Sequence, residues 1–197
     1  MLPRKNACHR LEMGDYLLKI YLIHILLQGD SKVAMADGSQ KKLRDLHVGD
    51  LLATKKGQSP SRVRCVVKSV QTDGTADLIK LPGSELLATP WHPVRKGTQW
   101  VFPVDVGTTK RVSCDAVYNL LLDDGCYAVI EGWDCVTLAH GLTGDVVSHS
   151  YYGTKAVVRD LMGMDGWANG LVVLHPDSVV TQRDASTGRV ISIAPVS

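Results

Sequence analysis

Thr89 and His92 are the pair of side chains in this sequence best suited to peptide chemistry. They lie three positions apart in the run Thr89-Pro90-Trp91-His92, directly after an apolar stretch. A threonine hydroxyl both donates and accepts hydrogen bonds, and a histidine near its ordinary pKa can carry a proton in either direction. Such a pair can hold a peptide amide and protonate its nitrogen. The alternative interpretation is a turn at a strand end with a partly exposed histidine.

The residues around this pair follow a pattern of short strands separated by turns. Within 62–70, Val63, Cys65 and Val67 alternate with charged residues, which predicts a half-buried strand. Strands that recur at a spacing of about 8–12 residues indicate an all-β body. The other predicted strands are 32–36, 51–54, 76–81, 100–104, 117–122, 127–130 and 135–138.

One hairpin and one helix complete the predicted elements. Strands 117–122 and 127–130 flank Asp123-Asp124-Gly125, a turn sequence, and are therefore predicted to pair as a hairpin. We interpret Asn119 as a structural residue that pins this hairpin. Helical spacing occurs once, late in the chain, where 154–162 places its apolar residues on one side.

The bulk composition restricts the classes of function. The chain has 197 residues, 45% of them hydrophobic, and predicts one domain with a real core. Its net charge is only +2 and its 22 basic residues are dispersed, which argues against a nucleic-acid partner. The apolar stretch 16–27 is shorter than the roughly 20 residues that cross a bilayer, so we expect no membrane span.

The cysteines also restrict the setting. Their number is five, and none are spaced as C-x-x-C, so neither a disulfide framework nor a zinc cluster is expected. Free thiols favour a reducing compartment, and the expected location is cytoplasmic. The sequence predicts no metal site and no cofactor.

Three blocks of sequence follow one another in a recognisable order. They are 33–39 with 43–50, then 87–94 with 100–103, and finally 117–122 with 135–141. Together they resemble the Hint superfamily, which includes inteins and the autoprocessing domain of hedgehog proteins. The resemblance is closest to the Vint branch, Hint domains found beside von Willebrand factor A domains, and segments 149–154 and 166–170 share it.

The resemblance covers about 29–190, which leaves 1–28 as a poorly defined lead-in and 191–197 as a tail. It implies an all-β horseshoe of short antiparallel strands with one late short helix. It also implies a reaction in cis, in which the partner is the chain's own upstream polypeptide. In such domains a cysteine or serine at the first residue attacks the preceding carbonyl, and a second nucleophile then cleaves the resulting thioester or ester.

Four residues are assigned roles by this resemblance. Thr89 would hydrogen-bond the scissile peptide, and His92 would strain the amide and protonate its nitrogen. Cys135 lies near the position of a second cysteine of hedgehog-type domains, and its alternative is a buried structural thiol. His140 corresponds to a late histidine that assists the final cleavage, and its alternative is a capping or core residue.

The position of the nucleophile departs from the family pattern. Leu26 stands where the attacking cysteine is expected, and a leucine side chain cannot attack a carbonyl. Cys8 lies too far upstream to replace it, and Ser31 lies beyond the glycine that follows the first residue. We therefore predict an inactive relative, unless 1–28 does not represent the natural upstream sequence. The alternative function is a non-catalytic interaction or scaffold module within a larger multidomain protein.

Overall fold

The computed structural model describes residues 25–54 and 59–196. Most of the predicted lead-in, including Cys8 and the larger part of the apolar stretch 16–27, lies outside the described residues. No helix of the described part is long and apolar enough to cross a bilayer.

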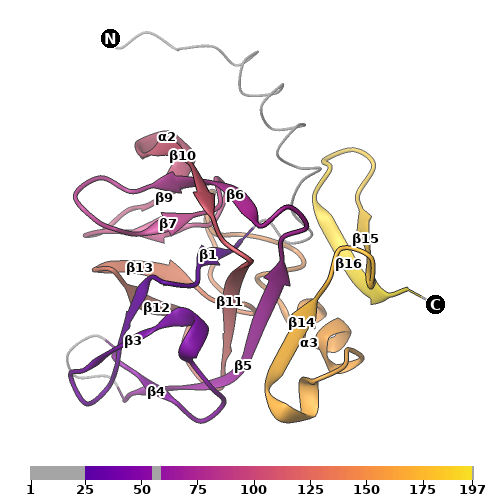
Figure 1. The fold of residues 1–197 in the computed structure, drawn as a ribbon, viewed down its shortest axis with the longest axis horizontal. Helices are drawn as coiled ribbons and strands as arrows, with labels where there is room; N and C mark the ends of the chain where they lie inside the picture. Colours follow the sequence, from indigo (N-terminus) through magenta and orange to yellow (C-terminus); the bar gives the residue numbers. More distant parts are fainter. Residues whose placement is uncertain (1–24, 55–58, 197) are drawn as a thin grey trace, which may run out of the picture.

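Eight strands form the large curled sheet of the fold (Figure 1). They are β1 (Leu27–Gln28), β4 (Leu51–Leu52), β5 (Ser61–Val70), β6 (Thr75–Lys80), β7 (Leu87–Ala88), β10 (Thr108–Ser113), β11 (Ala116–Leu122) and β14 (Leu171–Leu174). Their order is β10-β6-β7-β1-β11-β5-β14, with β4 paired to β5. All pairs are antiparallel except β14 with β5. The predicted alternation in β5 is confirmed, because Arg62 and Arg64 are exposed while Val63, Cys65 and Val67 are buried.

A second sheet of six strands packs against the first. It is ordered β3-β2-β12-β13-β8-β9, and a separate ribbon pairs β15 with β16. The bounds are β2 (Lys32–Ala34), β3 (Gln40–Lys42), β8 (Val94–Arg95), β9 (Trp100–Val101), β12 (Tyr127–Ile130), β13 (Trp133–Val136), β15 (Val179–Arg183) and β16 (Val190–Pro195). The all-β fold class is therefore confirmed. Ordered structure extends into the predicted lead-in at β1 and into the predicted tail at β16.

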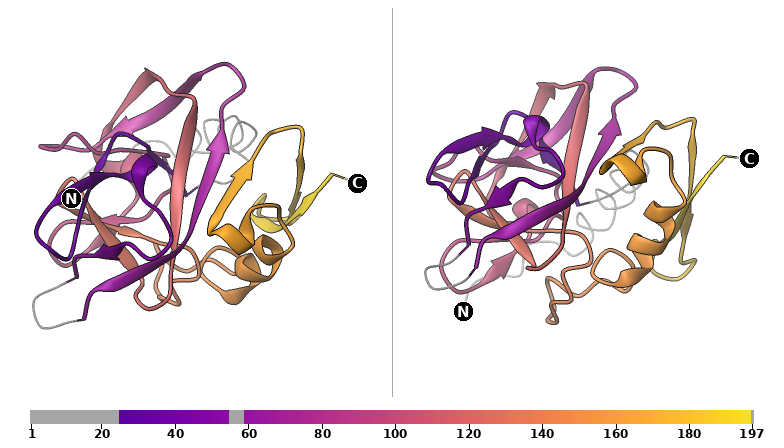
Figure 2. Two further views of the ribbon diagram at one scale, coloured as in Figure 1. Left: turned by 60° about the horizontal axis from the view of Figure 1, so that its bottom comes forward. Right: turned by 90° about the horizontal axis from the view of Figure 1, so that it is seen from below.

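Few helices accompany the strands. The predicted late helix is confirmed as α3 (Lys155–Met162), and the Thr154 hydroxyl caps it by accepting the N–H of Ala156 at 3.2 Å. Figure 2 shows α3 and the β15–β16 ribbon together at the β14 end of the molecule. The short helix α2 (Pro103–Val106) was not predicted, and the shorter 3-10 turns are η1 (Leu43–Asp45) and η2 (Trp167–Asn169). The predicted strand 100–104 ends early because Pro103 suits the first turn of a helix.

The predicted hairpin is wrong. β11 pairs with β5 and β1 in the large sheet, whereas β12 pairs with β13 and β2 in the smaller one. Every residue of β11 is buried, as in a central strand covered on both faces. The turn 123–125 therefore carries the chain from one sheet to the other, and Gly125 adopts a φ of 108° there.

Two apolar clusters lie on opposite faces of β11. Its alternate residues Val117 and Leu121 belong to one cluster, and Tyr118 and Leu120 belong to the other. β1 divides in the same way, because Leu26 just before it joins the first cluster and Leu27 joins the second. A polar side chain at position 119 must therefore point to the same face as Leu26.

Candidate functional site

The register of the sheet places the peptide before Leu26 between two polar side chains. β1 lies between β7 and β11, with Leu27 opposite both Ala88 and Tyr118. One residue earlier, the same antiparallel register sets Leu26 between Thr89 and Asn119. The predicted motif thus lies beside this peptide on one neighbouring strand, and Asn119, for which only a structural role in a hairpin was predicted, lies beside it on the other.

Hydrogen bonds hold both polar atoms of the Ile25–Leu26 peptide. The N–H of Leu26 donates to Thr89 Oγ1 at 2.9 Å, and the Thr89 hydroxyl donates to the carbonyl oxygen of Leu26 at 3.1 Å. Asn119 Nδ2 donates to the carbonyl oxygen of Ile25 at 2.6 Å. The N–H of Leu120 donates to Asn119 Oδ1 at 2.7 Å, which fixes the orientation of the amide. The nitrogen of this peptide is thus hydrogen-bonded to the Thr89 hydroxyl, and its oxygen is hydrogen-bonded to the Asn119 side-chain amide.

His92 lies buried beside this peptide. Its backbone N–H donates to the Thr89 carbonyl at 3.1 Å, which closes the turn between the two residues. Burial, with a smaller contribution from the nearby His140, lowers the pKa of His92 to about 3, although the backbone of Val136 and of Ile25 opposes the shift. Neither ring nitrogen makes a well-formed hydrogen bond within the described part of the chain. His92 is therefore neutral at neutral pH and has unused hydrogen-bonding capacity, which is rare for a buried side chain.

Asn119 is the residue of this candidate site that sequence reasoning assigned wrongly. It cannot pin a hairpin that does not exist, and its side chain bonds across the sheet to a carbonyl 94 positions earlier in the chain. A signal for this role was present, because Asn119 is the one amide in the otherwise apolar strand 116–122. A buried amide requires hydrogen-bond partners, and in a central strand the backbone of the neighbouring segment supplies them.

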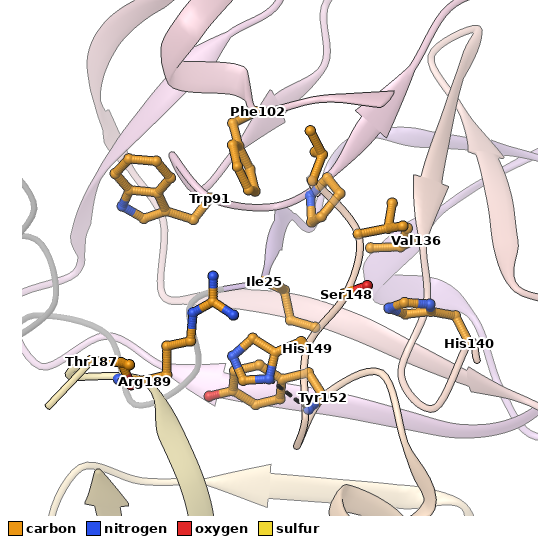
Figure 3. A pocket seen from close by; sticks show the side chains of 13 residues that line it. Ile25, Trp91, Phe102, Val136, His140, Ser148, His149, Tyr152, Thr187 and Arg189 are labelled. Carbon is orange, nitrogen blue, oxygen red and sulfur yellow. Dashed lines mark hydrogen bonds between the residues drawn. The ribbon is translucent and has the colours of Figure 1, made fainter. Parts of the chain in front are cut away.

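A cavity of about 270 Å³ opens next to Ile25 (Figure 3). Its walls are mainly apolar and aromatic, and His140 is among them, so the predicted late histidine lies close to the gripped peptide. The lining residues are Ile25, Trp91, Pro93, Phe102, Val136, His140, Val146, Val147, Ser148, His149, Tyr152, Thr187 and Arg189.

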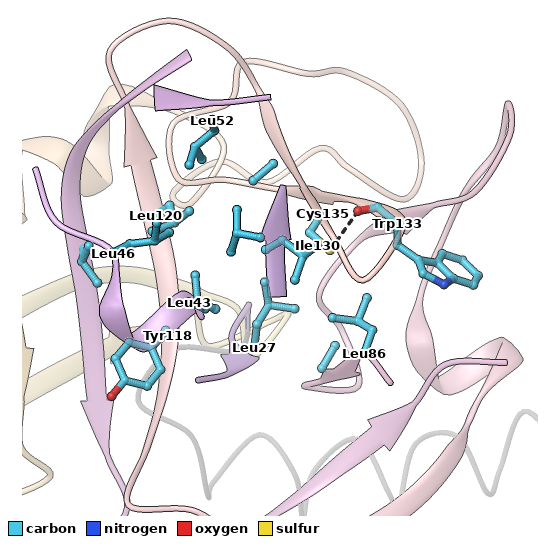
Figure 4. Packing of buried hydrophobic residues seen from close by; sticks show 14 of the residues in the cluster. Leu27, Leu43, Leu46, Leu52, Leu86, Tyr118, Leu120, Ile130, Trp133 and Cys135 are labelled. Atoms are coloured by element: carbon cyan, nitrogen blue, oxygen red, sulfur yellow. Dashed lines mark hydrogen bonds between the residues drawn. The ribbon is translucent and has the colours of Figure 1, made fainter. Parts of the chain in front are cut away.

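Cys135 is placed away from this cavity. Its thiol lies in the buried cluster between the sheets with Leu27, Leu86 and Ile130 (Figure 4). It donates to the carbonyl of Trp133 at 3.7 Å. Burial raises the pKa of the Cys135 thiol well above its usual range, which disfavours the reactive thiolate. The next residue, Val136, faces the cavity instead, because side chains alternate along a strand.

Comparisons with known proteins give the family. The similar solved structures include an intein-like domain from Clostridium thermocellum (TM-score 0.45, 14% identity, 57% of this chain and 98% of that chain), the gp41-1 intein (0.42, 15%, 57% and 96%) and the MchDnaB-1 intein (0.39, 19%, 56% and 98%). No curated protein matched the chain. The sequence model of the Vint family, described as a Hint domain, matches residues 26–192. This match spans most of the chain and begins at the gripped residue, so the protein belongs to the Vint family of Hint domains.

Proposed function

We propose that this domain binds its own upstream polypeptide at Ile25–Leu26 as a self-processing domain binds a scissile bond, but does not cleave it. The observation that carries the proposal is the double hold on this peptide, by Thr89 at its nitrogen and by Asn119 at its oxygen. The partner is thus the chain itself, in cis.

The same geometry defines how a nucleophile at position 26 would react. Neutral His92 would take the proton of a thiol there, and the sulfur would attack the carbonyl carbon of Ile25. The negative charge that develops on the carbonyl oxygen would be met by the Asn119 Nδ2–H donor. The bond between carbon and nitrogen would then break, the nitrogen would receive the proton from His92, and a thioester would remain. A histidine that is neutral before the reaction can first accept the thiol proton as a base and then donate it to the leaving nitrogen as an acid.

Leu26 stops this sequence at its first step. Its side chain is fully buried in the cluster that contains Val117 and Leu121, and it consists only of carbon and hydrogen. No sulfur or oxygen is therefore offered to the carbonyl of Ile25 from position 26. The intact hold on the peptide also suits the second candidate function, a non-catalytic interaction or scaffold module that anchors the upstream chain of a larger protein.

The absence of cleavage can be tested with the full chain fused behind a folded reporter. We expect one intact band on a denaturing gel after prolonged incubation, with or without dithiothreitol or hydroxylamine. Release of the reporter in the unchanged sequence, abolished by His92→Ala and retained in the exposed control His47→Ala, would refute the proposed inactivity.

We also propose that Cys135 is structural rather than catalytic. Cys135→Ala is expected to lower the free energy of unfolding by about 1 kcal/mol, because a buried sulfur is lost from a packed cluster. The half-buried Cys114 supplies the control, and Cys114→Ala should cost less than about 0.5 kcal/mol. Urea unfolding measures both. If Cys135→Ala instead halts cleavage in an active Leu26→Cys background without loss of fold, the thiol takes part in the reaction.

A cytoplasmic location is part of the same proposal. Among the described cysteines, Cys65, Cys114 and Cys135 are free thiols. Free thiols persist most readily in a reducing compartment.

A further inference from the structure

The cavity beside Ile25 is lined by the kinds of side chain that line binding sites for small ligands. Trp91 and Phe102 meet edge to face at 5.3 Å between ring centroids on one side, and Tyr152 lies across from them (Figure 3). Its volume of about 270 Å³ lies just below the usual range of pockets for drug-sized ligands. The space therefore suits a compact ligand with an apolar body.

Two histidines on its wall present hydrogen-bond donors. His140 Nδ1 accepts the N–H of Leu142 at 2.9 Å, and His149 Nδ1 accepts the N–H of Tyr151 at 3.2 Å. Burial lowers the pKa of both rings, that of His149 to about 4 with a further contribution from Arg189, so both are neutral at neutral pH. A neutral imidazole that accepts at Nδ1 carries its hydrogen on Nε2. Each ring therefore has an N–H, rather than a lone pair, left for a ligand.

Arg189 adds a positive charge to the same wall. Figure 3 shows its guanidinium above the His149 ring, directed toward Trp91. No carboxylate among residues 25–54 and 59–196 forms an ion pair with it. A guanidinium only donates hydrogen bonds. The guanidinium and the His149 imidazole thus form a pair of donors beside an apolar surface, while His140 lies farther along the wall (Figure 3).

We propose that this cavity binds a small carboxylate with an aromatic or aliphatic body. The carboxylate, which only accepts hydrogen bonds, lies against Arg189 and the N–H of His149, and the body packs on Trp91 and Phe102. An ammonium ligand would meet a like charge and no acceptor on these two donor side chains. The inference does not rest on the proposed function, because Arg189, Trp91 and Phe102 make none of the hydrogen bonds that hold the Ile25–Leu26 peptide.

The probe pair is 3-phenylpropionate and its neutral amide, titrated into the full chain at pH 7.5 by calorimetry. We expect the carboxylate to bind about threefold to fivefold more tightly than the amide, the difference that one exposed ion pair supplies. Arg189→Gln should remove this preference and leave the affinity for the amide unchanged. Arg159→Gln is the matched control, because it removes an exposed arginine of α3 outside the cavity and should keep the preference.

A second variant tests the place of binding. Val146→Trp fills the cavity and should abolish binding of both probes, with a thermal melt to verify the fold. The proposal is overturned if neither probe binds the unchanged chain, if the amide binds as well as the carboxylate, or if the preference survives Arg189→Gln. Binding that persists in folded Val146→Trp would also overturn it, since the ligand would then lie elsewhere.

Discussion

Leu26→Cys is expected to convert the chain into one that cleaves after Ile25, and Asn119→Ala in that background to slow cleavage by about 10²–10³-fold. The variant adds the missing thiol where Thr89 and His92 already lie beside the peptide. Asn119 Nδ2, at 2.6 Å from the Ile25 oxygen, stands where negative charge develops during the attack. Removing one such donor costs this much in other acyl transfers because the charge forms in a site closed to water.

The rate would be followed as release of a folded upstream reporter in hydroxylamine, which cleaves a thioester. Asn169→Ala is the matched control, because this asparagine is exposed in η2 and should leave the rate unchanged. Circular dichroism separates slow chemistry from unfolding, since Asn119 also bonds to the backbone of Leu120. An equal cleavage rate with and without Asn119→Ala would show that Asn119 does not stabilise the charge on the Ile25 oxygen. A folded Leu26→Cys variant that never cleaves would favour the scaffold function instead.

Local patterns in the sequence predicted one half of this site well. Thr89 and His92 lie in one turn, joined by a backbone hydrogen bond of 3.1 Å, so their spacing alone brings them together. Asn119 joins them only through the order of strands in the large sheet, which places β11 next to β1. Strand order depends on packing between distant segments, and no local spacing encodes it.

Two other differences have the same origin. Asp123-Asp124-Gly125 is a good turn sequence, but a turn does not determine whether its two strands pair, and burial of β11 on both faces separated them here. Cys135 and Val136 show how sensitive a strand is to register. A shift of one residue exchanges the faces, so the thiol lies in the core while the valine faces the cavity.

Acid is expected to destabilise the fold strongly between pH 6.5 and 4.5, a window that lies above the ordinary pKa values of carboxylates. Burial holds the pKa of His92 at about 3 and that of His149 at about 4, whereas unfolded histidines titrate near 6.5. The unfolded chain therefore binds more protons in this window, and the free energy of unfolding falls as the pH falls. Each group contributes up to about 1.4 kcal/mol per pH unit, or about 3 kcal/mol over the window for His92 and less for the partly exposed His149. Asp184, with a pKa of about 2, loses its contribution only in stronger acid.

Urea unfolding at a series of pH values measures this slope. His92→Gln should reduce the slope by about one proton, because glutamine does not titrate, whatever its effect on stability at pH 7. The exposed control His47→Gln should keep the slope of the unchanged chain. If His92→Gln also keeps that slope, His92 is protonated or solvated in the folded protein. A reduced slope means that His92 meets the peptide as a neutral imidazole, which can take a proton from a thiol at position 26 before returning it to the leaving nitrogen. The neutral state of the buried His92 ring would then explain both the loss of stability in acid and the ability of His92 to deprotonate a thiol, the step that Leu26 prevents.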